Sequence, residues 1–310
     1  MEDKDIGAAS VDGVISSLGN AKISVMDRGF LYGDSIYEVI RTFDGTPLFF
    51  DEHWNRFKNS AKLVNLKLSF SKQELLVEIR KIFDEVKLPK DIDFYIRYIV
   101  TRGQGPIDLF PHSNLNQSLI VIVKKMRSWE EVFYRRGIKL AVPQIKRNSI
   151  NTLDPNIKGG NYLNNILGLM SSRELGADDC LMLNEGGHIT ESSSSNIFFV
   201  IKNNLVTPSK SSGNLNGLTK CAVQEICKNK GIENSEIYID LNMIDQANEC
   251  FITSSTRGIM PVASIILSNG KVIKFPDGGG KYTRKLISYY EDYLNNYVAS
   301  NKDFLLYKKL

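Results

Sequence analysis

The chain has 310 residues, of which 42% are hydrophobic and 24% charged, and its formal net charge is +4 at pH 7. This length allows one very large domain or two ordinary ones, and the composition is typical of a globular protein. Basic and acidic residues are interspersed, which argues against nucleic acid as a partner. The 4 cysteines form no C-x-x-C pair and the 3 histidines no H-E-x-x-H motif, so no disulfide framework or metal site is expected.

The N-terminal sequence and the hydropathy bear on cellular location. Met1–Asp5 lacks the basic segment and the following apolar stretch that mark a secretory signal. No apolar run approaches the length that is needed to span a bilayer. We therefore expect a cytoplasmic protein that does not associate with membranes.

The first part of the chain alternates predicted strands and helices. Strands are expected over residues 23–26, the later part of 30–43, 94–101 and 119–124, and helices over 51–64 and 72–85. The first helix is expected to begin with Asp51 as its N-cap and to bury Trp54 and Phe57. The charged stretch 128–137 breaks the alternation and is interpreted as a linker between a smaller N-terminal domain, 1–127, and a larger C-terminal domain, 138–310.

The second part of the chain continues the mixture of strands and helices. Strands are expected over 138–142, 180–183, 196–202 and 249–253, and helices after residue 162, over 217–230 and over 282–297. Most strands connect through hairpins, with helices interspersed. This arrangement favours an α+β fold with mixed or antiparallel sheets over a parallel doubly wound sheet.

The most informative stretch is Asp154–Asn165, in which a proline and two glycines fix the shape of a turn that carries Lys158. The helix that follows has apolar residues at helical spacing, which we expect to form a buried stripe: Leu163, Ile166, Leu167 and Met170. A lysine held at a helix entrance suits Schiff-base chemistry. Most lysines are solvated surface charges, so the spacing alone leaves both interpretations open.

Other segments are suited to bind anions. Arg56 lies beside the apolar stripe of its predicted helix, and Arg97 could grip a carboxylate at two points. The helix entrance Gly217–Thr219 and the turn Ser254–Thr256 offer backbone N–H groups and hydroxyls. Each has an ordinary explanation as a surface or paired arginine, a capped helix or a polar turn. Together with a held lysine they indicate a phosphate site beside an amine, as pyridoxal 5′-phosphate requires.

Four blocks of sequence resemble the class IV aminotransferases, the fold-type IV pyridoxal-phosphate family. In chain order the blocks are Tyr32–Arg41, Lys158–Leu163, Thr190–Phe198 and Gly217–Thr219. The family includes branched-chain amino-acid aminotransferase, D-amino-acid aminotransferase and aminodeoxychorismate lyase. The resemblance implies a two-domain α+β fold of the D-amino-acid aminotransferase type. It also implies a homodimer in which the loop around Leu109 of one chain helps to close the site of the other.

The resemblance assigns cofactor roles to particular residues. Lys158 would be the catalytic residue, which forms the Schiff base and then moves a proton between substrate and cofactor. Glu191 would favour the protonated pyridine nitrogen of the cofactor; its alternative role is that of an ordinary surface acid. Tyr162 would donate a hydrogen bond to the cofactor's phenolic oxygen; its alternative role is that of a core tyrosine. The remaining implied contacts bind the phosphate or support the bend at Glu191: Arg56, Asn196, Leu218, Thr219 and Ser255.

The implied substrate pocket comprises Tyr32, Tyr37, Val39, Arg41, Tyr95, Arg97 and Thr256. Residues 95–97 resemble the branched-chain enzymes, but Val39 stands where those enzymes usually have glycine and resembles the D-amino-acid enzymes. The D-specific enzymes carry an arginine–histidine pair for the carboxylate in the loop after Arg102, and this chain lacks it. We therefore expect L-leucine, L-isoleucine or L-valine as donor and 2-oxoglutarate as acceptor. A D-amino-acid aminotransferase, an aminodeoxychorismate lyase and a non-catalytic relative are the alternatives.

Overall fold

The computed structural model describes residues 6–308, which form two compact units. Met1–Asp5, expected to carry no targeting signal, lies outside the described residues. The first unit contains the chain up to Arg127, the segment Ile157–Asn161 and the chain from Leu294 onward, and the second contains Ser128–Asn156 and Tyr162–Tyr293. The two units therefore do not correspond to one cut of the chain at residues 128–137, because Ile157–Asn161 and the chain from Leu294 onward belong to the first unit.

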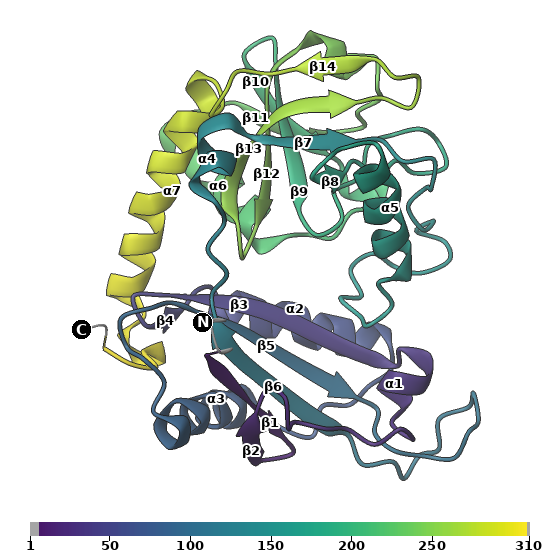
Figure 1. Cartoon of the computed structure of the whole chain (residues 1–310), viewed down its shortest axis with the longest axis vertical. Coiled ribbons are helices and arrows are strands. Elements are labelled where there is room, and N and C mark those ends of the chain that lie inside the picture. Colours follow the sequence, from purple (N-terminus) through teal and green to yellow (C-terminus); the bar gives the residue numbers. More distant parts are fainter. Residues whose placement is uncertain (1–5, 309–310) are drawn as a thin grey trace. The chain divides into compact units, whose positions relative to one another are not determined.

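The first unit is built on a six-stranded antiparallel sheet with the order β2-β1-β6-β5-β3-β4. Its strands are β1 (Gly7–Val11), β2 (Val14–Ser17), β3 (Ser35–Phe43), β4 (Thr46–Pro47), β5 (Phe94–Thr101) and β6 (Ser118–Lys125). Its helices include α1 (Arg28–Tyr32), α2 (Phe50–Leu63) and α3 (Lys72–Val86). Helix α2 packs on β3, and α3 packs on β1 and β6 (Figure 1). The alternating strands bury their apolar residues against these two helices.

The C-terminal chain completes the core of the first unit. The ring of Tyr307 lies 5.1 Å from that of Phe83 and 5.8 Å from that of Phe94, measured between centroids. Its hydroxyl donates to the Ile92 carbonyl at 2.7 Å. Phe304 and Leu306 pack against the same cluster. The core of this unit therefore combines residues from both ends of the sequence.

Two local predictions for the first unit are wrong. Residues 23–26 form no strand; the helix α1 follows instead, because Asp27 caps it by accepting from the Gly29 amide at 2.7 Å and Gly33 ends it at φ 67°. The N-cap of α2 is Phe49 rather than Asp51, and it makes no side-chain cap bond. Asp51 lies in the first turn of α2, where a negative charge stabilises the helix dipole.

The second unit is built on a mixed sheet with the order β11-β10-β9-β12-β13-β7-β8, and β14 also pairs with β13. The strands are β7 (Ile138–Ala141), β8 (Asp179–Cys180), β9 (Asn196–Ile201), β10 (Asn204–Pro208), β11 (Asn234–Ile237), β12 (Ala247–Ser254), β13 (Gly258–Ile266) and β14 (Val272–Lys274). The helices are α4 (Glu131–Arg136), α5 (Leu163–Glu174), α6 (Leu218–Lys230) and the first part of α7 (Lys281–Ser300). Short 3-10 helices lie at Lys210–Ser212, Met243–Gln246 and, in the first unit, Lys302–Phe304.

The predicted buried stripe of α5 is wrong. Its four members are exposed by between 41% and 66%: Leu163, Ile166, Leu167 and Met170. The helix instead buries Asn165, Gly168 and Ser172. A Cβ at Gly168 would lie 2.5 Å from the sulfur of Met182, so only the small-residue face can approach the sheet this closely.

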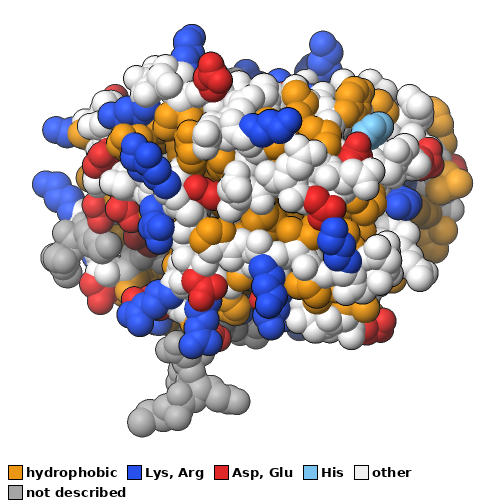
Figure 2. All heavy atoms as spheres, turned by 90° about the horizontal axis from the view of Figure 1, so that it is seen from above, with side chains coloured by type: hydrophobic (Ala, Val, Ile, Leu, Met, Phe, Trp, Pro, Cys, Tyr) orange, Lys and Arg blue, Asp and Glu red, His pale blue; other side chains and the backbone are white. Residues whose placement is uncertain are grey.

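The α+β class, with one antiparallel and one mixed sheet flanked by helices, is confirmed. On the face in Figure 2, Lys and Arg side chains are mixed with Asp and Glu side chains, as their interspersed positions in the sequence predict. Within residues 6–308, no helix combines the length and the apolar character that a membrane crossing requires.

Candidate active site

The predicted site residues divide between the two units. The first unit holds Tyr32, Tyr37, Val39, Arg41, Arg56, Tyr95, Arg97 and Lys158. The second unit holds Tyr162, Glu191, Asn196, Leu218, Thr219, Ser255 and Thr256. Each group forms its own network of contacts.

Lys158 lies in the segment Ile157–Asn161, which belongs to the first unit although the chain on both sides belongs to the second. The Lys158 amide donates to Ser60 Oγ at 3.1 Å, and the Lys158 carbonyl accepts from the Tyr37 amide at 2.8 Å. Ser60 comes from α2 and Tyr37 from β3. Regular elements therefore fix the backbone of the lysine on both sides.

The two glycines that follow Lys158 allow this segment to lie against the start of β3. A Cβ at Gly160 would be 2.4 Å from Ser35 Oγ, and one at Gly159 would be 3.2 Å from the Ser35 carbonyl oxygen. The Gly160 amide donates to that carbonyl at 3.0 Å. The glycines are thus required by a close approach between segments that are distant in sequence.

The side chain of Lys158 contacts Tyr37. Lys158 Nζ lies 3.4 Å from the Tyr37 hydroxyl, to which it donates, and 4.6 Å from the centre of the ring. The Arg97 guanidinium lies 3.9 Å from the centre of the same ring. The buried side chain of Tyr37 therefore contacts both the predicted catalytic amine of Lys158 and Arg97, the arginine that is predicted to bind a substrate carboxylate.

β3 and β5 place the other predicted substrate residues opposite one another. Val39 pairs with Arg97, and Arg41 pairs with Tyr95. These residues alternate with the ones that face α2 and α3, so they lie on the other face of the sheet. The Nε atoms of Arg41 and Arg97 are buried, and neither has a hydrogen-bond partner within the described chain. Two such cationic side chains fit an anionic ligand at this face.

Tyr32 ends α1 and lies 4.9 Å from the guanidinium of Arg28, measured to the ring centre. Arg28 is buried, and it donates to the carbonyls of Asp108 and Leu109 at 2.5 and 2.8 Å. Asp34 lies 3.0 Å from Arg28 Nε. A buried arginine thus holds the loop around Leu109, which the family resemblance expects to help close the site of the other chain in a homodimer.

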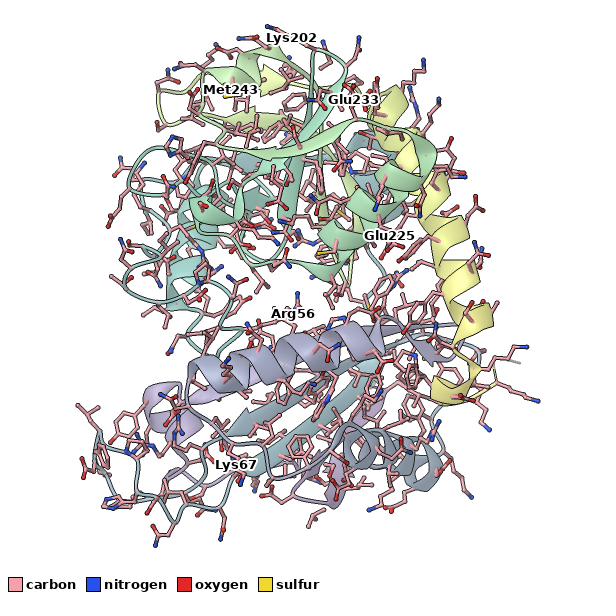
Figure 3. The ribbon with its side chains drawn as sticks, turned by 180° about the vertical axis from the view of Figure 1, so that it is seen from behind. Arg56, Lys67, Lys202, Glu225, Glu233 and Met243 are labelled. Atoms are coloured by element: carbon pink, nitrogen blue, oxygen red, sulfur yellow. The ribbon has the colours of Figure 1, made fainter. Side chains whose placement is uncertain are left out.

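Arg56 lies on α2 (Figure 3). His53 precedes it by nearly one turn of the same helix. Its Nε and Nη2 atoms each donate to one carboxylate oxygen of Glu38, both at 2.7 Å. His53 Nδ1 lies 2.7 Å from the same carboxylate. Glu38 is fully buried, so this two-point pair fixes the guanidinium that the resemblance assigns to the phosphate.

The protonation states of this cluster follow from its burial and its charges. Burial alone raises the pKa of Glu38, but the charge of Arg56, together with His53 and the hydrogen bonds, outweighs burial and holds the pKa well below its usual value. Burial lowers the pKa of His53 below its ordinary value, although Glu38 opposes this shift. At neutral pH the cluster therefore contains a carboxylate, a guanidinium and a neutral imidazole.

Glu191 precedes the serine-rich bend of the second unit and is buried. Arg147 Nη2 lies 3.0 Å from Glu191 Oε1, and the Leu215 amide donates to Oε2 at 3.1 Å. Arg147 Nη1 donates to Asn165 Oδ1 at 2.9 Å. The carboxylate is therefore held in one orientation from both sides.

The entrance of α6 fits a phosphate group. Its N-cap is Gly217, which supplies no side-chain bond, so the helix's own side chains leave its first N–H groups uncapped, including that of Leu218. Thr219 Oγ1 is buried and has no hydrogen-bond partner among residues 6–308. Asn196 Nδ2 donates to the Leu215 carbonyl at 2.8 Å, which ties the start of β9 to the segment that leads into α6. A buried hydroxyl beside uncapped amides is what an anion would satisfy.

The remaining predicted residues of the second unit lie at element boundaries. Ser255 and Thr256 form the turn between β12 and β13 and are partly exposed. Tyr162 immediately precedes α5 and is also partly exposed. The structure thus places each of these side chains where a ligand could reach it.

The sequence analysis did not single out several residues of these networks, among them Glu38, His53 and Arg147. Glu38 shares a strand face with Ile40 and therefore points to the core side of β3, and a charged residue at such a position requires a partner. This signal could have led to Glu38. Arg147 meets Glu191 across a long sequence separation, and no spacing rule indicates that contact.

A model of the family described as amino-transferase class IV matches residues 35–265. The chain therefore belongs to the class IV aminotransferases, as the resemblance implied, and aminotransferase activity is what this membership assigns to it.

Individual relatives carry two kinds of name. A putative branched-chain-amino-acid aminotransferase of Methanocaldococcus jannaschii is 32% identical over 88% of this chain and 91% of its own. A D-alanine aminotransferase of Bacillus licheniformis is 28% identical over 82% of this chain and 87% of its own. The solved branched-chain amino acid aminotransferase of Escherichia coli is 26% identical, covers 91% of this chain and 92% of its own, and has a TM-score of 0.80.

Proposed function

We propose that this protein transfers the amino group of L-leucine, L-isoleucine or L-valine to 2-oxoglutarate, with pyridoxal 5′-phosphate as cofactor. The products would be a branched 2-oxo acid and L-glutamate. The observation that carries the proposal is the anchoring of Lys158 by α2 and β3, with its amine at Tyr37 and Arg97 over the same ring. This arrangement presents an amine and a carboxylate-binding group to one substrate.

The residues present fit the cofactor. In the second unit, Thr219, the uncapped start of α6 and the Ser255 turn suit its phosphate. Within the first unit, Arg56 is a cation that suits the same group, as the family resemblance implies. Glu191 suits a protonated ring nitrogen, and Tyr162 and Asn196 are proposed to support the ring and the bend. When bound, the cofactor supplies an aldehyde that reacts with amines and a ring that accepts electrons. The protein's own part is to hold Lys158 Nζ where it can take a proton from the substrate Cα and return it.

The preference for branched-chain substrates is supported by the names of the relatives and by the lack of an arginine–histidine pair in the loop after Arg102. Solved structures of the same fold and several relatives are named branched-chain aminotransferases, including the relative that is 32% identical. Val39 is paired with Arg97 on the substrate-side face of the sheet, where the branched-chain enzymes usually have glycine. This residue therefore favours the second candidate, a D-amino-acid aminotransferase, and the proposal gives the missing carboxylate-binding pair more weight.

A D-amino-acid aminotransferase is the second candidate, because relatives named D-alanine aminotransferase are 28 to 31% identical to this chain. A panel of L- and D-amino acids with 2-oxoglutarate separates the two, when glutamate formation is measured for each donor. Turnover of L-branched donors supports the proposal. Turnover confined to D-alanine and other D-donors would replace it, and pyruvate release from aminodeoxychorismate would indicate a lyase.

Lys158→Ala tests the catalytic assignment. We expect turnover to be lost and the visible absorbance of the lysine-bound cofactor to disappear, because no other amine is assigned to that bond. Lys146→Ala is the matched control, since Lys146 lies a short way before Lys158 in the chain but its side chain carries no assigned role. Retained colour and turnover in Lys158→Ala would show that the lysine assignment is wrong.

We also propose a homodimer. Its support in this chain is the loop held by Arg28, which exposes Ile107, Leu109 and Phe110 by 74%, 80% and 75%. Apolar side chains gathered in this way are typical of a protein–protein contact. Light scattering of the purified chain measures its mass in solution, and a monomer at assay concentration would contradict the proposal.

A further inference from the structure

A buried ion pair in the second unit lies outside the residues that the proposed function uses. Asp179 of β8 is 1% exposed, and its Oδ2 atom lies 2.8 Å from Nη1 of Arg257. Its Oδ1 atom accepts from the amides of Cys180 and Ser193 at 2.8 and 3.2 Å. Asp179 therefore joins the turn after β12 to the serine bend after Glu191.

Arg257 is held on several sides. It directly follows Ser255 and Thr256, and its amide donates to Ser254 Oγ at 3.2 Å. Its guanidinium lies 4.5 Å from the ring centre of Trp129, and its carbonyl accepts from the Tyr134 hydroxyl at 3.0 Å. Because backbone and side chain are both restrained, the conformation of the turn depends on this residue.

The contacts continue from Ser193 to Glu191. Asn165 Nδ2 donates to the Ser193 carbonyl at 2.8 Å, and Asn165 Oδ1 accepts from Arg147. Arg147 in turn pairs with Glu191. A continuous series of polar contacts thus runs from the Ser255 turn through Asp179 to the carboxylate of Glu191, entirely within one unit.

We infer that Asp179 and Arg257 are positioning residues, which hold the Ser255–Thr256 turn in the conformation that binds the cofactor's phosphate. The inference rests on the proposed function, because it presumes that this turn contacts pyridoxal 5′-phosphate. A merely structural ion pair would stabilise the fold without favouring a phosphate-bearing ligand. The two roles therefore predict different ligand preferences.

The test compares pyridoxal 5′-phosphate with pyridoxal, which lacks the phosphate, as ligands of the full chain freed of cofactor. Absorbance titrations give the dissociation constant of each ligand for the unsubstituted chain, Arg257→Gln and Asp179→Asn. In Arg257→Gln we expect the constant for pyridoxal 5′-phosphate to rise about 10- to 100-fold, the range known for outer residues of metal sites. The dissociation constant for pyridoxal should change less than about twofold, because Ser255 is assigned to the phosphate and Thr256 to the amino-acid substrate, and neither is assigned to the pyridine ring.

Two further variants keep the test interpretable. Arg257→Lys retains the charge but loses the planar group over Trp129, so it should fold and show a smaller shift in the same direction. Asp178→Asn is the matched control: Asp178 adjoins Asp179, but its carboxylate contacts the exposed Arg173 at 3.9 Å and the Lys139 amide at 2.8 Å, and neither group belongs to the series that leads to Glu191. We expect the affinities of Asp178→Asn to be unchanged.

The possible outcomes separate the inference from the proposed function. If the affinities for pyridoxal 5′-phosphate and pyridoxal fell equally, or if neither affinity changed in Arg257→Gln and Arg257→Lys, the inference would be wrong. The proposed aminotransferase function would not be affected by either result. Failure of the unsubstituted chain to bind pyridoxal 5′-phosphate would overturn both. A selective loss for the phosphate-bearing ligand supports the positioning role.

Discussion

Glu38 is fully buried on a strand whose neighbouring core residues are apolar, yet it is ionised. Arg56 and His53 compensate the cost of burying this carboxylate, since both lie 2.7 Å from it. The same pair fixes Arg56, which otherwise could adopt many side-chain conformations. A single buried acid thus links the stability of the first unit to the geometry of its proposed anion site.

Glu38→Gln should lower the free energy of unfolding by about 3 to 5 kcal/mol, because it removes the buried carboxylate that pairs with the guanidinium of Arg56, whose side chain is only 12% exposed. Urea unfolding of the variant measures the loss. Glu52→Gln is the control, since Glu52 is an exposed residue of the same region and should change stability by less than about 0.5 kcal/mol. A Glu38→Gln protein as stable as the unsubstituted chain would show that the pair is not needed.

At the scale of elements, α5 shows how packing overrides hydrophobic periodicity. Its apolar residues are exposed, and its contact face is made of Asn165, Gly168 and Ser172. Asn165 is buried because it bonds Ser193 and Arg147, and Ser172 Oγ donates to the Ala141 carbonyl at 3.1 Å. Specific polar contacts and a close glycine approach therefore decide which face is buried.

Gly168→Leu should destabilise the protein by about 1 to 3 kcal/mol, because the added side chain would displace Met182 from a filled core. Met170→Ser should change stability by less than about 0.5 kcal/mol, since Met170 is 57% exposed. Thermal unfolding of both variants measures these two changes in stability and shows which face of α5 is buried. The reverse order of effects would mean that the apolar face of α5 is the buried one.

Local sequence signals predicted many of the strands and helices but not the contacts that anchor the site residues. The alternation in β5 gave its bounds, Phe94–Thr101, and the amphipathic pattern of α3 gave its start at Lys72. The caps of α1, Asp27 and Gly33, were visible in the sequence but outweighed by the apolar residues before them. The anchoring of Lys158 by Ser60, and that of Glu191 by Arg147, joins distant segments, and local patterns carry no information about such contacts.

At the scale of the whole molecule, buried titratable groups set the response to acid. The pKa values of Glu38 and His53 are both lower in the folded protein than their ordinary values. The unfolded chain therefore binds more protons, and stability falls as the pH falls. The contribution of His53 begins to be lost near pH 6.5 and that of Glu38 near pH 4.5, the ordinary pKa values of the two side chains.

We expect the free energy of unfolding to decrease steadily below about pH 6.5, when it is measured by urea unfolding at a series of pH values. His53→Gln should flatten the part of this profile between about pH 6.5 and 4.5, because glutamine does not titrate. The unsubstituted chain, measured in parallel, is the reference for this comparison. An unaltered slope in His53→Gln would contradict the assignment of that window to His53.

The last residues of the chain also affect how the protein is made. Tyr307 packs against both Phe83 and Phe94, which also contact each other, so the core of the first unit is incomplete until this segment has been synthesised. During translation, nascent domains generally fold from the N-terminus as they emerge. Here the core of the N-terminal sheet is completed only after the segment that carries Phe304 and Tyr307 has left the ribosome, and truncation shortly before Phe304 would leave that sheet without part of its interior.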